Sequence, residues 1–553
     1  MPHRKTRAEH DWHGDVQDRA STDMATVVRE MERKYDPAAA GKAALDAVKA
    51  MTGVAGIAAV SQQDEQVLDA IYFDTADLRL IRAGITLRRR TGGKDAGWHL
   101  KLPVGQGARD ELRLPLVAPR NRPSRPAARG AAAAARGRSA SAVPKELAAL
   151  VRAHTRGEAL APVMRIQTSR RVLRLLGDGG RGLAELAADH VSAEPADGAA
   201  ALSWDEIEAE LVTGGPKLLK AIDNRLRSAG ARPAATGTKL QRALGSRLPT
   251  TIAAPETPLT ARSPAGEVVL AYLRRQVAAI TRYDPLMRRD EPDAVHQMRV
   301  ATRRARSALQ AFGQIIQREA TRPLGEELKW LAAVLGDARD GEVLLARFTA
   351  ELAAIPPELV IGPVETRITG YFTTELARAG KAALEVLDGR RYLHLLNDLD
   401  LLIADPPLTP LAERKAGKVL AKPVRRAARR LQRALAAVPD AEDQDAAIHE
   451  ARKATKRARY AAEAAMPALG GKARRQAAQA KKLQELLGDH HDSVVARTVL
   501  LDLAGQARAA GEDTFVYGVM HQRQACHAAG IERTLPHLVI RAKNERFGGE
   551  ATR

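Results

Sequence analysis

Two short stretches of the sequence carry the same pattern of cations, and this pattern suits the binding of phosphate. Residues 294–309 read AVHQMRVATRRARSAL, and residues 447–462 read AIHEARKATKRARYAA. On a helix that turns about 100° per residue, the shared cations of each stretch occupy roughly half of the circumference. They are His296, Arg299, Arg303, Arg304 and Arg306 in the first copy, and His449, Arg452, Lys456, Arg457 and Arg459 in the second, where Lys453 adds a further charge.

Such a density of positive charge predicts an anionic partner. Like charges about four residues apart on a helix repel each other, so a polyanion that neutralises them stabilises the helix. Guanidinium groups bind phosphate oxygens in pairs, and a histidine adds a donor that protonation switches. Two facing copies would form a groove lined by about ten cations, with residues 422–433 (KPVRRAARRLQR) as a third wall. A flexible linear polyanion would bind there by releasing its counterions.

Two other interpretations of these stretches are weighed against phosphate binding. A solvated charged face is the ordinary explanation of a basic helix, but the repeated histidine and arginine offsets favour a binding site. A metal site on these stretches is disfavoured, because His296, His449 and the HHD run at 490–492 lack a cysteine or glutamate at the usual ligand spacing.

A second element is also duplicated after each basic stretch. Residues 335–340 read LGDARD, and residues 487–492 read LGDHHD. We interpret both as acidic helix ends whose Asp340 and Asp492 anchor basic side chains. Two repeats about 150 residues apart favour two pseudo-symmetric helical bundles over a long solenoid.

The first half of the chain places carboxylates and cations together on strands. Side chains alternate across a strand, so Glu30, Glu32 and Lys34 share one face. The same spacing recurs in Arg88 and Arg90, in Arg109 and Glu111, and in Glu206, Glu208 and Glu210, with Lys101 on a further strand. If the strands close into a barrel, its interior can hold Mg²⁺ or Mn²⁺ on carboxylates and phosphate on cations. The alternative is a sheet whose polar face contacts water.

These residues require two different kinds of element to position them. Strand-like alternation dominates the first half and helical periodicity the second, which predicts an α+β protein. We expect a disordered tail over 1–23, a strand-rich domain over 24–248 with a low-complexity insertion at 119–142, a linker at 249–264, and a duplicated all-α domain over 265–545.

Composition narrows the classes of partner. The 553 residues carry a formal net charge of +21, which indicates a polyanion, whereas aromatic residues make up 3%, which disfavours stacking on single-stranded nucleic acid. The single cysteine, Cys526, excludes a disulfide within the chain. The start lacks an apolar signal core, and no run of about 18 apolar residues occurs, so we expect a cytoplasmic protein without a membrane partner.

Both halves resemble known families. The first half resembles the CYTH domain, the triphosphate tunnel metalloenzyme fold, through the motifs EMERK (30–34), YFDT (72–75), ITLRRR (85–90), WHLKLP (98–103), RDE (109–111), Arg165 with Arg170 and Arg171, Asp189, and EIEAE (206–210). The second half resembles the CHAD domain through its paired H-x₂-R-x₃-[RK]-R elements.

The resemblance implies an eight-stranded antiparallel tunnel that binds a triphosphate and Mg²⁺ or Mn²⁺. Its implied metal ligands are Glu30, Glu32, Asp189, Glu206, Glu208 and Glu210. Its implied triphosphate-binding residues are Lys34, Arg88, Arg90, Lys101, Arg109, Arg165 and Arg170. The CHAD resemblance implies that the His/Arg helices bind inorganic polyphosphate.

Three features depart from the family pattern. Arg113 stands where the RxExE run has its last acid, His99 stands at the usual Thr-x-Lys threonine, and the Ala/Arg insertion is unusual. These departures bear on rate and substrate choice more than on the fold. For catalysis we expect Lys34, desolvated among other cations, to act as a general base.

We therefore expect metal-dependent hydrolysis of inorganic triphosphate or a related triphosphate, combined with polyphosphate binding and an association with polyphosphate granules. The alternative is a non-catalytic polyphosphate-binding or granule-targeting protein. Nucleic-acid binding is a third hypothesis, but no motif that reads a groove is present, so no sequence-specific contact is expected.

Overall fold

A computed structural model describes residues 26–37, 41–105, 108–116, 142–235, 237–248 and 258–544. The expected tail at 1–23, residues 119–141 of the expected insertion at 119–142 and residues 249–257 of the expected linker lie outside the described residues. The chain divides into two compact units, and each is considered by itself.

The first unit, Met1–Ala142 with Ala159–Pro249, is built on one antiparallel sheet. Its strands are β1 (Thr26–Asp36), β2 (Ala59–Gln62), β3 (Gln66–Asp74), β4 (Thr86–Thr91), β5 (Gly97–Gly105), β6 (Ala108–Pro115), β7 (Ala161–Leu176), β8 (Gly182–Pro195), β9 (Leu202–Leu211) and β10 (Arg232–Pro233). Its helices are α1 (Gly41–Lys49), α2 (Arg79–Arg82), α5 (Pro216–Ser228) and α6 (Lys239–Leu244).

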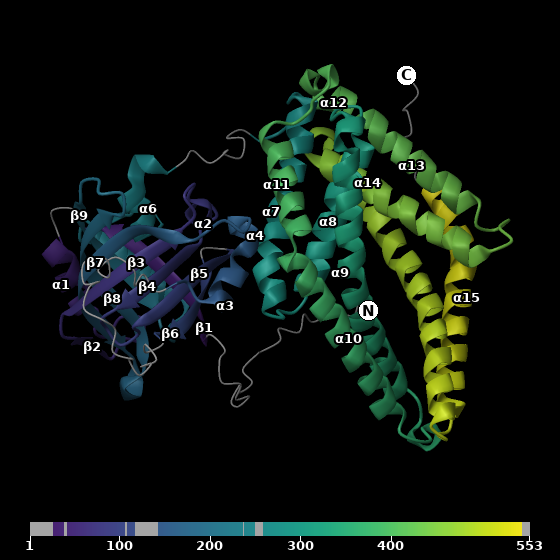
Figure 1. Ribbon diagram of the computed structural model, residues 1–553, viewed down its shortest axis with the longest axis horizontal. Helices are drawn as coiled ribbons and strands as arrows, with labels where there is room; N and C mark the ends of the chain where they lie inside the picture. Colours follow the sequence, from purple (N-terminus) through teal and green to yellow (C-terminus); the bar gives the residue numbers. More distant parts are fainter. Residues whose placement is uncertain are drawn as a thin grey trace, which may run out of the picture. The chain divides into compact units, whose positions relative to one another are not determined.

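The sheet closes on itself. Neighbouring strands follow the order β1-β6-β5-β4-β3-β7-β8-β9, and β9 pairs back onto β1 with Lys34 opposite Glu208. The expected antiparallel tunnel is therefore confirmed (Figure 1). Within the described residues the sheet has ten strands rather than the expected eight, because the short β10 and β2 add to the edges of β1 and β7 outside the closed ring.

The outer face of the ring carries an apolar layer that fixes the register of β9. Ile207 and Ala209 are buried in one cluster with Leu218 and Ile222 of α5. Because strand side chains alternate, burying these two residues outward turns Glu206, Glu208 and Glu210 inward, as the sequence pattern predicted.

The second unit, Val143–Glu158 with Thr250–Arg553, is helical. Its helices are α3 (Lys145–Leu150), α4 (Arg152–Thr155), α7 (Ala265–Arg288), α8 (Ala294–Ala311), α9 (Arg318–Ala353), α10 (Val364–Asp388), α11 (Arg390–Ala404), α12 (Ala416–Val419), α13 (Ala421–Ala436), α14 (Gln444–Ala509) and α15 (Phe515–Asn544). The expected all-α character is confirmed, and Val143–Glu158 packs with these helices although it lies within the range expected for the first domain.

Helix α14 consists of two arms that meet at Gly470, whose φ of 58° interrupts the helix. Contacts between the arms run in opposite directions: Asp445 pairs with Arg497, and Arg459 with Gln484. The arms therefore form an antiparallel hairpin, as α8 and α9 do through the Arg299–Asp340 pair. The two hairpins are the structural form of the duplication in the sequence.

The basic stretches become α8 and the first arm of α14, and both bury alanines on the face opposite their cations. Ala301, Ala305 and Ala308 are at most 3% exposed, which allows close helix packing. Across the part of the chain that the structure describes, no helix combines the length and hydropathy needed to cross a bilayer.

Candidate functional site

The interior of the closed sheet is lined by charged side chains of both signs. The predicted residues that line this cavity are Glu32, Lys34, Arg88, Arg90, Lys101, Arg109, Arg170, Glu208 and Glu210. They come from six of the eight strands of the ring, and antiparallel register brings distant positions together: Arg170 lies opposite Asp189, and Lys101 opposite Glu111. The predicted cations and carboxylates therefore share one hollow.

Three predicted carboxylates gather at one point of the tunnel wall. Oxygen atoms of Asp189, Glu206 and Glu208 lie within 4.8 Å of one another, and all three residues are buried or nearly so. Arg170 donates to Asp189 at 2.8 Å and also contacts Glu208. Burial alone would raise the pKa of Glu208, but the charges of Lys239, Lys34 and Arg170 outweigh it and hold this pKa well below its usual range.

Lys239 occupies the centre of these carboxylates, and the sequence analysis missed it. Its Nζ lies 2.8 Å from Asp189, 2.7 Å from Glu206 and 2.6 Å from Glu208. It follows Thr238, which caps the start of α6 through the Gln241 amide. A capping threonine in the sequence indicates where the helix starts, but it does not indicate that the next side chain enters the tunnel.

The donor set of this cluster fits a hard divalent ion. All three ligands are carboxylates, the type that Mg²⁺ and Mn²⁺ prefer. Glu206 Oε1 is buried and lies 2.7 Å from the Lys239 ammonium. A divalent ion at the centre of the three carboxylates would take the place of this ammonium, so Lys239 and the metal compete for the same oxygens.

Replacing Lys239 by Met is expected to lower the free energy of unfolding by about 3–5 kcal/mol, because three buried carboxylates lose their cation. Mn²⁺ should then raise the melting temperature of the Lys239→Met variant more than that of the unaltered protein, as measured by thermal unfolding. Lys217→Met, which removes an exposed lysine of α5, serves as the control and should change neither quantity. An equal response of all three proteins to Mn²⁺ would contradict metal binding at the cluster.

A second acidic centre of the tunnel is Glu111, which is 1% exposed. His99 Nδ1 lies 3.0 Å from its carboxylate, Lys101 and Arg88 each approach to 3.6 Å, and Arg113 also pairs with it. Burial opposes ionisation of Glu111, but these neighbours hold its pKa below the usual range. The two departures from the family pattern, His99 and Arg113, thus hold an inward carboxylate in place.

The cations on the tunnel wall are partly removed from water, which disfavours their charged forms. Burial, together with the charges of Arg88 and Arg170, lowers the pKa of Arg90 to about 9. A phosphate chain bound there would relieve the repulsion among these guanidinium groups.

Two predicted tunnel residues are placed neither in the cavity lining nor in the carboxylate cluster. Arg165 lies on the outer face of β7 and pairs with Asp69 at 2.8 Å, so its assignment to the triphosphate is corrected. The reason is strand alternation: Arg165 is five residues from the inward Arg170 and therefore faces the opposite way. Glu30 lies on β1 opposite Arg109, but its side chain is outside the described part of the structure.

The sequence predicts that Lys34 is a general base surrounded by cations, but in the structure carboxylates lie around its ammonium. Its ammonium pairs with Glu208 and lies 3.9 Å from Glu32 and 4.0 Å from Glu206. Its surroundings place Lys34 as a cation that links β1 to the carboxylates of β9.

The helical unit gathers part of the second predicted set into another hollow. His296, Arg299, Arg303, Arg452 and Lys456 line it, together with Tyr460 and Asp492. Arg299 donates to Asp340 at 2.7 Å, and Arg452 lies 3.9 Å from Asp492. Both aspartates therefore anchor cations as predicted, but they lie inside α9 and the second arm of α14 rather than at helix ends.

Arg303 and Lys456 carry the least compensated charges of this hollow. Among the described residues, neither forms an ion pair with a carboxylate. Burial and the charges of Arg299 and Arg452 lower the pKa of Arg303. Burial and the charges of Arg303, Arg452 and Arg299 lower the pKa of Lys456 to about 6.

The remaining predicted cations of the helical unit point elsewhere, so the hollow holds five basic residues rather than about ten. Arg304 and Arg459 both pair with Glu463. Lys453 pairs with Glu450 on the exposed surface, and the rings of His449 and His491 lie with their centroids 4.9 Å apart, tilted by 44°. Arg457 lines a separate hollow with Arg426 and Arg430 of α13, and Arg306 is close enough to affect the Arg457 charge.

Comparisons with known proteins agree with this division. The sequence profile of the CYTH domain matches residues 29–242, and that of the CHAD domain matches residues 271–501. Uncharacterised proteins from two strains of Mycobacterium tuberculosis are 39% identical over 512 residues, or 90% of this chain and 93% of each relative.

Two solved structures are similar to one part of the chain each. The CHAD domain from the plant Ricinus communis is 28% identical with a TM-score of 0.43 and covers 52% of this chain and 96% of its own. HpAC1 from Hippeastrum, described as having a dominant triphosphatase activity, is 16% identical with a TM-score of 0.24 and covers 40% of this chain and 97% of its own.

Proposed function

The chain belongs to the family of proteins in which a CYTH domain precedes a CHAD domain, and from this premise we propose that its tunnel hydrolyses inorganic triphosphate or a related triphosphate with Mg²⁺ or Mn²⁺ while its helical unit binds inorganic polyphosphate. The observation that supports the hydrolase most directly is the tunnel lining. It places a wall of cations beside the cluster of Asp189, Glu206 and Glu208.

Each group of the tunnel has a part in this reaction. Asp189, Glu206 and Glu208 would hold the ion, with Glu32 and Glu210 nearby on the wall. A bound Mg²⁺ or Mn²⁺ supplies charge for the phosphate oxygens and a more acidic water. The cations Lys34, Arg88, Arg90, Lys101, Arg109 and Arg170 bind and orient the phosphates and stabilise the charge that spreads over them in the transition state.

Phosphate release from inorganic triphosphate, ATP and thiamine triphosphate by the full chain, with and without Mg²⁺ or Mn²⁺, tests the hydrolase. We expect release that requires the metal. Absence of release from all three substrates with either metal would reject the enzyme.

The alternative is a polyphosphate-binding or granule-targeting protein whose tunnel is inactive. One observation favours it: the Lys239 ammonium already fills the carboxylate cluster. This alternative predicts strong polyphosphate binding without metal-dependent hydrolysis. RNA that displaces polyphosphate at matched salt would instead favour nucleic acid as the partner.

Polyphosphate binding is expected to depend on pH through Lys456. In the free protein this lysine has a pKa of about 6, and a bound anion would raise it. Binding then takes up a proton above pH 6, so affinity should fall as pH rises, by up to about tenfold per pH unit. Measurements of polyphosphate affinity between pH 7 and 9 give this slope. The charge of the histidines changes little in this range, because the pKa values of His296, His449 and His491 are all lowered.

Lys456→Arg is the matched variant for this measurement. Arginine keeps its charge across the range, so the slope should flatten while binding persists. An unchanged slope in Lys456→Arg would assign the pH dependence to another group.

A further inference from the structure

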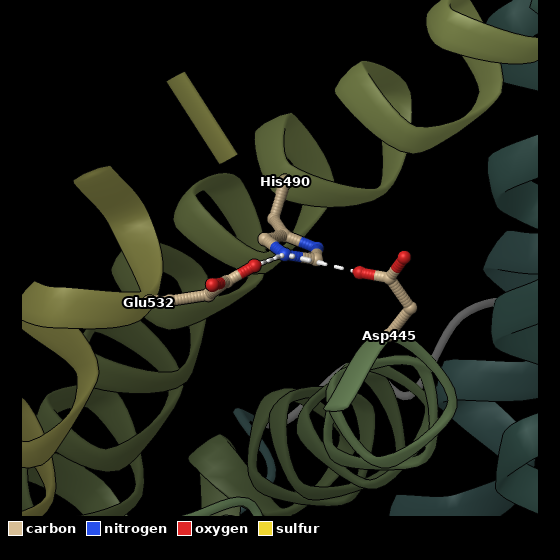
Figure 2. Close-up of side chains that lie close together, drawn as sticks. All are labelled: Asp445, His490 and Glu532. Atoms are coloured by element: carbon tan, nitrogen blue, oxygen red, sulfur yellow. Dashed lines mark hydrogen bonds and ion pairs between the residues drawn. The ribbon is translucent and has the colours of Figure 1, made fainter. Parts of the chain in front are cut away.

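Three helical segments of the second unit bring one histidine and two carboxylates to a single point. Figure 2 shows His490 between Asp445 and Glu532, each on a different segment. Asp445 lies in the first turn of α14, His490 in its second arm, and Glu532 in α15. His490 Nε2 is 2.9 Å from Glu532 Oε1 and 3.5 Å from Asp445 Oδ1, and the three atoms lie within 4.8 Å of one another.

A hydrogen bond accounts for only part of this arrangement. The Nε2 atom of an imidazole carries either one proton or one lone pair, so it serves one partner well. Glu532 is at that distance, whereas 3.5 Å to Asp445 is beyond an ordinary N–H···O bond. The other oxygen of Asp445 accepts from Arg497 at 3.1 Å, which leaves Oδ1 directed at the ring nitrogen.

We propose that His490 Nε2, Asp445 Oδ1 and Glu532 Oε1 bind one Zn²⁺. A tetrahedral zinc with bonds of about 2.0–2.1 Å separates its ligand atoms by about 3.3 Å. The separations of 2.9 Å and 3.5 Å from Nε2 lie on either side of that value, so small side-chain movements suffice. The third separation, between the two carboxylate oxygens, is at most 4.8 Å and closes by rotation of flexible side chains.

The chemistry of the donors selects the ion. An imidazole nitrogen with two carboxylate oxygens suits zinc, whereas Mg²⁺ prefers ligand sets made of oxygen alone. Two carboxylates balance the charge of the ion, and Arg497 holds the second oxygen of Asp445 at 3.1 Å. His490 is 1% exposed, but the side chains of Asp445 and Glu532 are 44% and 31% exposed, so solvent reaches the site and water can complete the coordination.

The site is separate from the basic hollow and has a structural consequence. The neighbours of His490 on the helix have other partners: Asp489 pairs with Arg347 and His527, and the His491 ring contacts the His449 ring. A zinc at His490 would tie the start of α14 to its own second arm and to α15. It would thereby stabilise the hairpin that presents Arg452 and Lys456.

Zinc titration of the full chain by calorimetry in millimolar Mg²⁺ tests the proposal, because Mg²⁺ occupies sites made only of oxygen. We expect His490→Gln to lose one zinc equivalent, or to weaken its binding by more than about 10-fold, a loss typical even for groups that only orient a ligand. His527→Gln is the matched control. His527 forms a similar histidine–carboxylate pair with Asp489 at 2.8 Å on the same two helical segments, but within the described residues no third ligand joins it.

Two further measurements test the zinc site even if His490→Gln folds poorly. Glu532→Gln alters a partly exposed ligand and should also weaken zinc binding, and zinc should raise the melting temperature of the unaltered protein but not that of Glu532→Gln. Anomalous scattering at the zinc edge from a crystal of the unaltered protein should place the ion between the three side chains. Equal zinc binding by all variants, or anomalous density only elsewhere, would overturn the site in favour of a metal-free histidine–carboxylate contact.

Discussion

Glu208→Gln is expected to lower kcat/KM for inorganic triphosphate by at least about 100-fold, the scale on which one preorganised charged group acts in a transition state. Glu208 is the residue on which the tunnel's cations converge: Lys34, Arg170 and Lys239 all contact its carboxylate. The amide keeps the shape of the side chain but removes the charge that a metal ligand needs. The measurement is phosphate release with Mg²⁺ or Mn²⁺ over a range of substrate concentrations.

Asp205→Asn provides the control on the same strand. Asp205 is exposed on the outer face of β9, where it pairs with His190 at 2.7 Å, and its substitution makes the same chemical change. Its activity should remain within about twofold of the unaltered protein. If Glu208→Gln and Asp205→Asn are equally active, the carboxylate cluster does not serve the reaction.

Thermal unfolding separates loss of chemistry from loss of structure in Glu208→Gln. The variant leaves three cations with one carboxylate fewer, so its melting temperature should fall. Activity measured well below that temperature still reports on the site. Added metal should rescue the rate only if the remaining Asp189 and Glu206 still hold the ion.

Strand alternation explains how much of the tunnel the sequence could predict. Glu32 and Lys34 share a face, as do Arg88 and Arg90, and all four line the cavity. The same rule, applied to the separation between Arg165 and Arg170, would have excluded Arg165. What alternation cannot supply is closure, because the pairing of β1 with β9 joins residues about 175 positions apart.

Lys239 shows a second limit of sequence reasoning. Its position depends on how α6 packs against the end of the tunnel, where Leu240 and Leu244 join a cluster with Tyr72 and Ile166. Tertiary contacts between such distant residues have no local signature. The same holds for Asp445, His490 and Glu532, whose spacing matches no ligand motif until the hairpin brings them together.

In the helical unit, the sequence repeat predicted that aspartates anchor basic side chains, but it did not predict how many cations line the hollow. The Arg299–Asp340 and Arg452–Asp492 pairs follow from the duplicated offsets. The number of cations that converge depends on helix rotation, which turns Arg304 toward Glu463 and away from the hollow. A helical wheel that is charged over half of its circumference therefore predicts a basic face. How the helix packs against its neighbours determines which of these cations line the hollow.

Arg303→Glu is expected to weaken polyphosphate binding at least about tenfold and to reduce its dependence on salt by about one phosphate contact. Arg303 lies among the like charges of Arg299, Arg452 and Lys456 in the hollow. The new carboxylate would pair with these cations and repel phosphate. Binding of long-chain polyphosphate measured at several salt concentrations gives both the affinity and the slope.

The same substitution distinguishes a binding role from a structural one, because its effects on folding and on binding have opposite signs. Arg303 is held in surroundings that disfavour its charge, so reversing that charge should leave the melting temperature unchanged or higher while binding falls. The carboxylate should also favour the charged form of Lys456 and so remove the pH dependence of the residual binding. Arg378→Glu, on α10 and paired with Glu375 on the exposed surface, makes the same charge change elsewhere in the unit. If Arg378→Glu weakens binding as much as Arg303→Glu, net charge rather than the hollow accounts for the affinity.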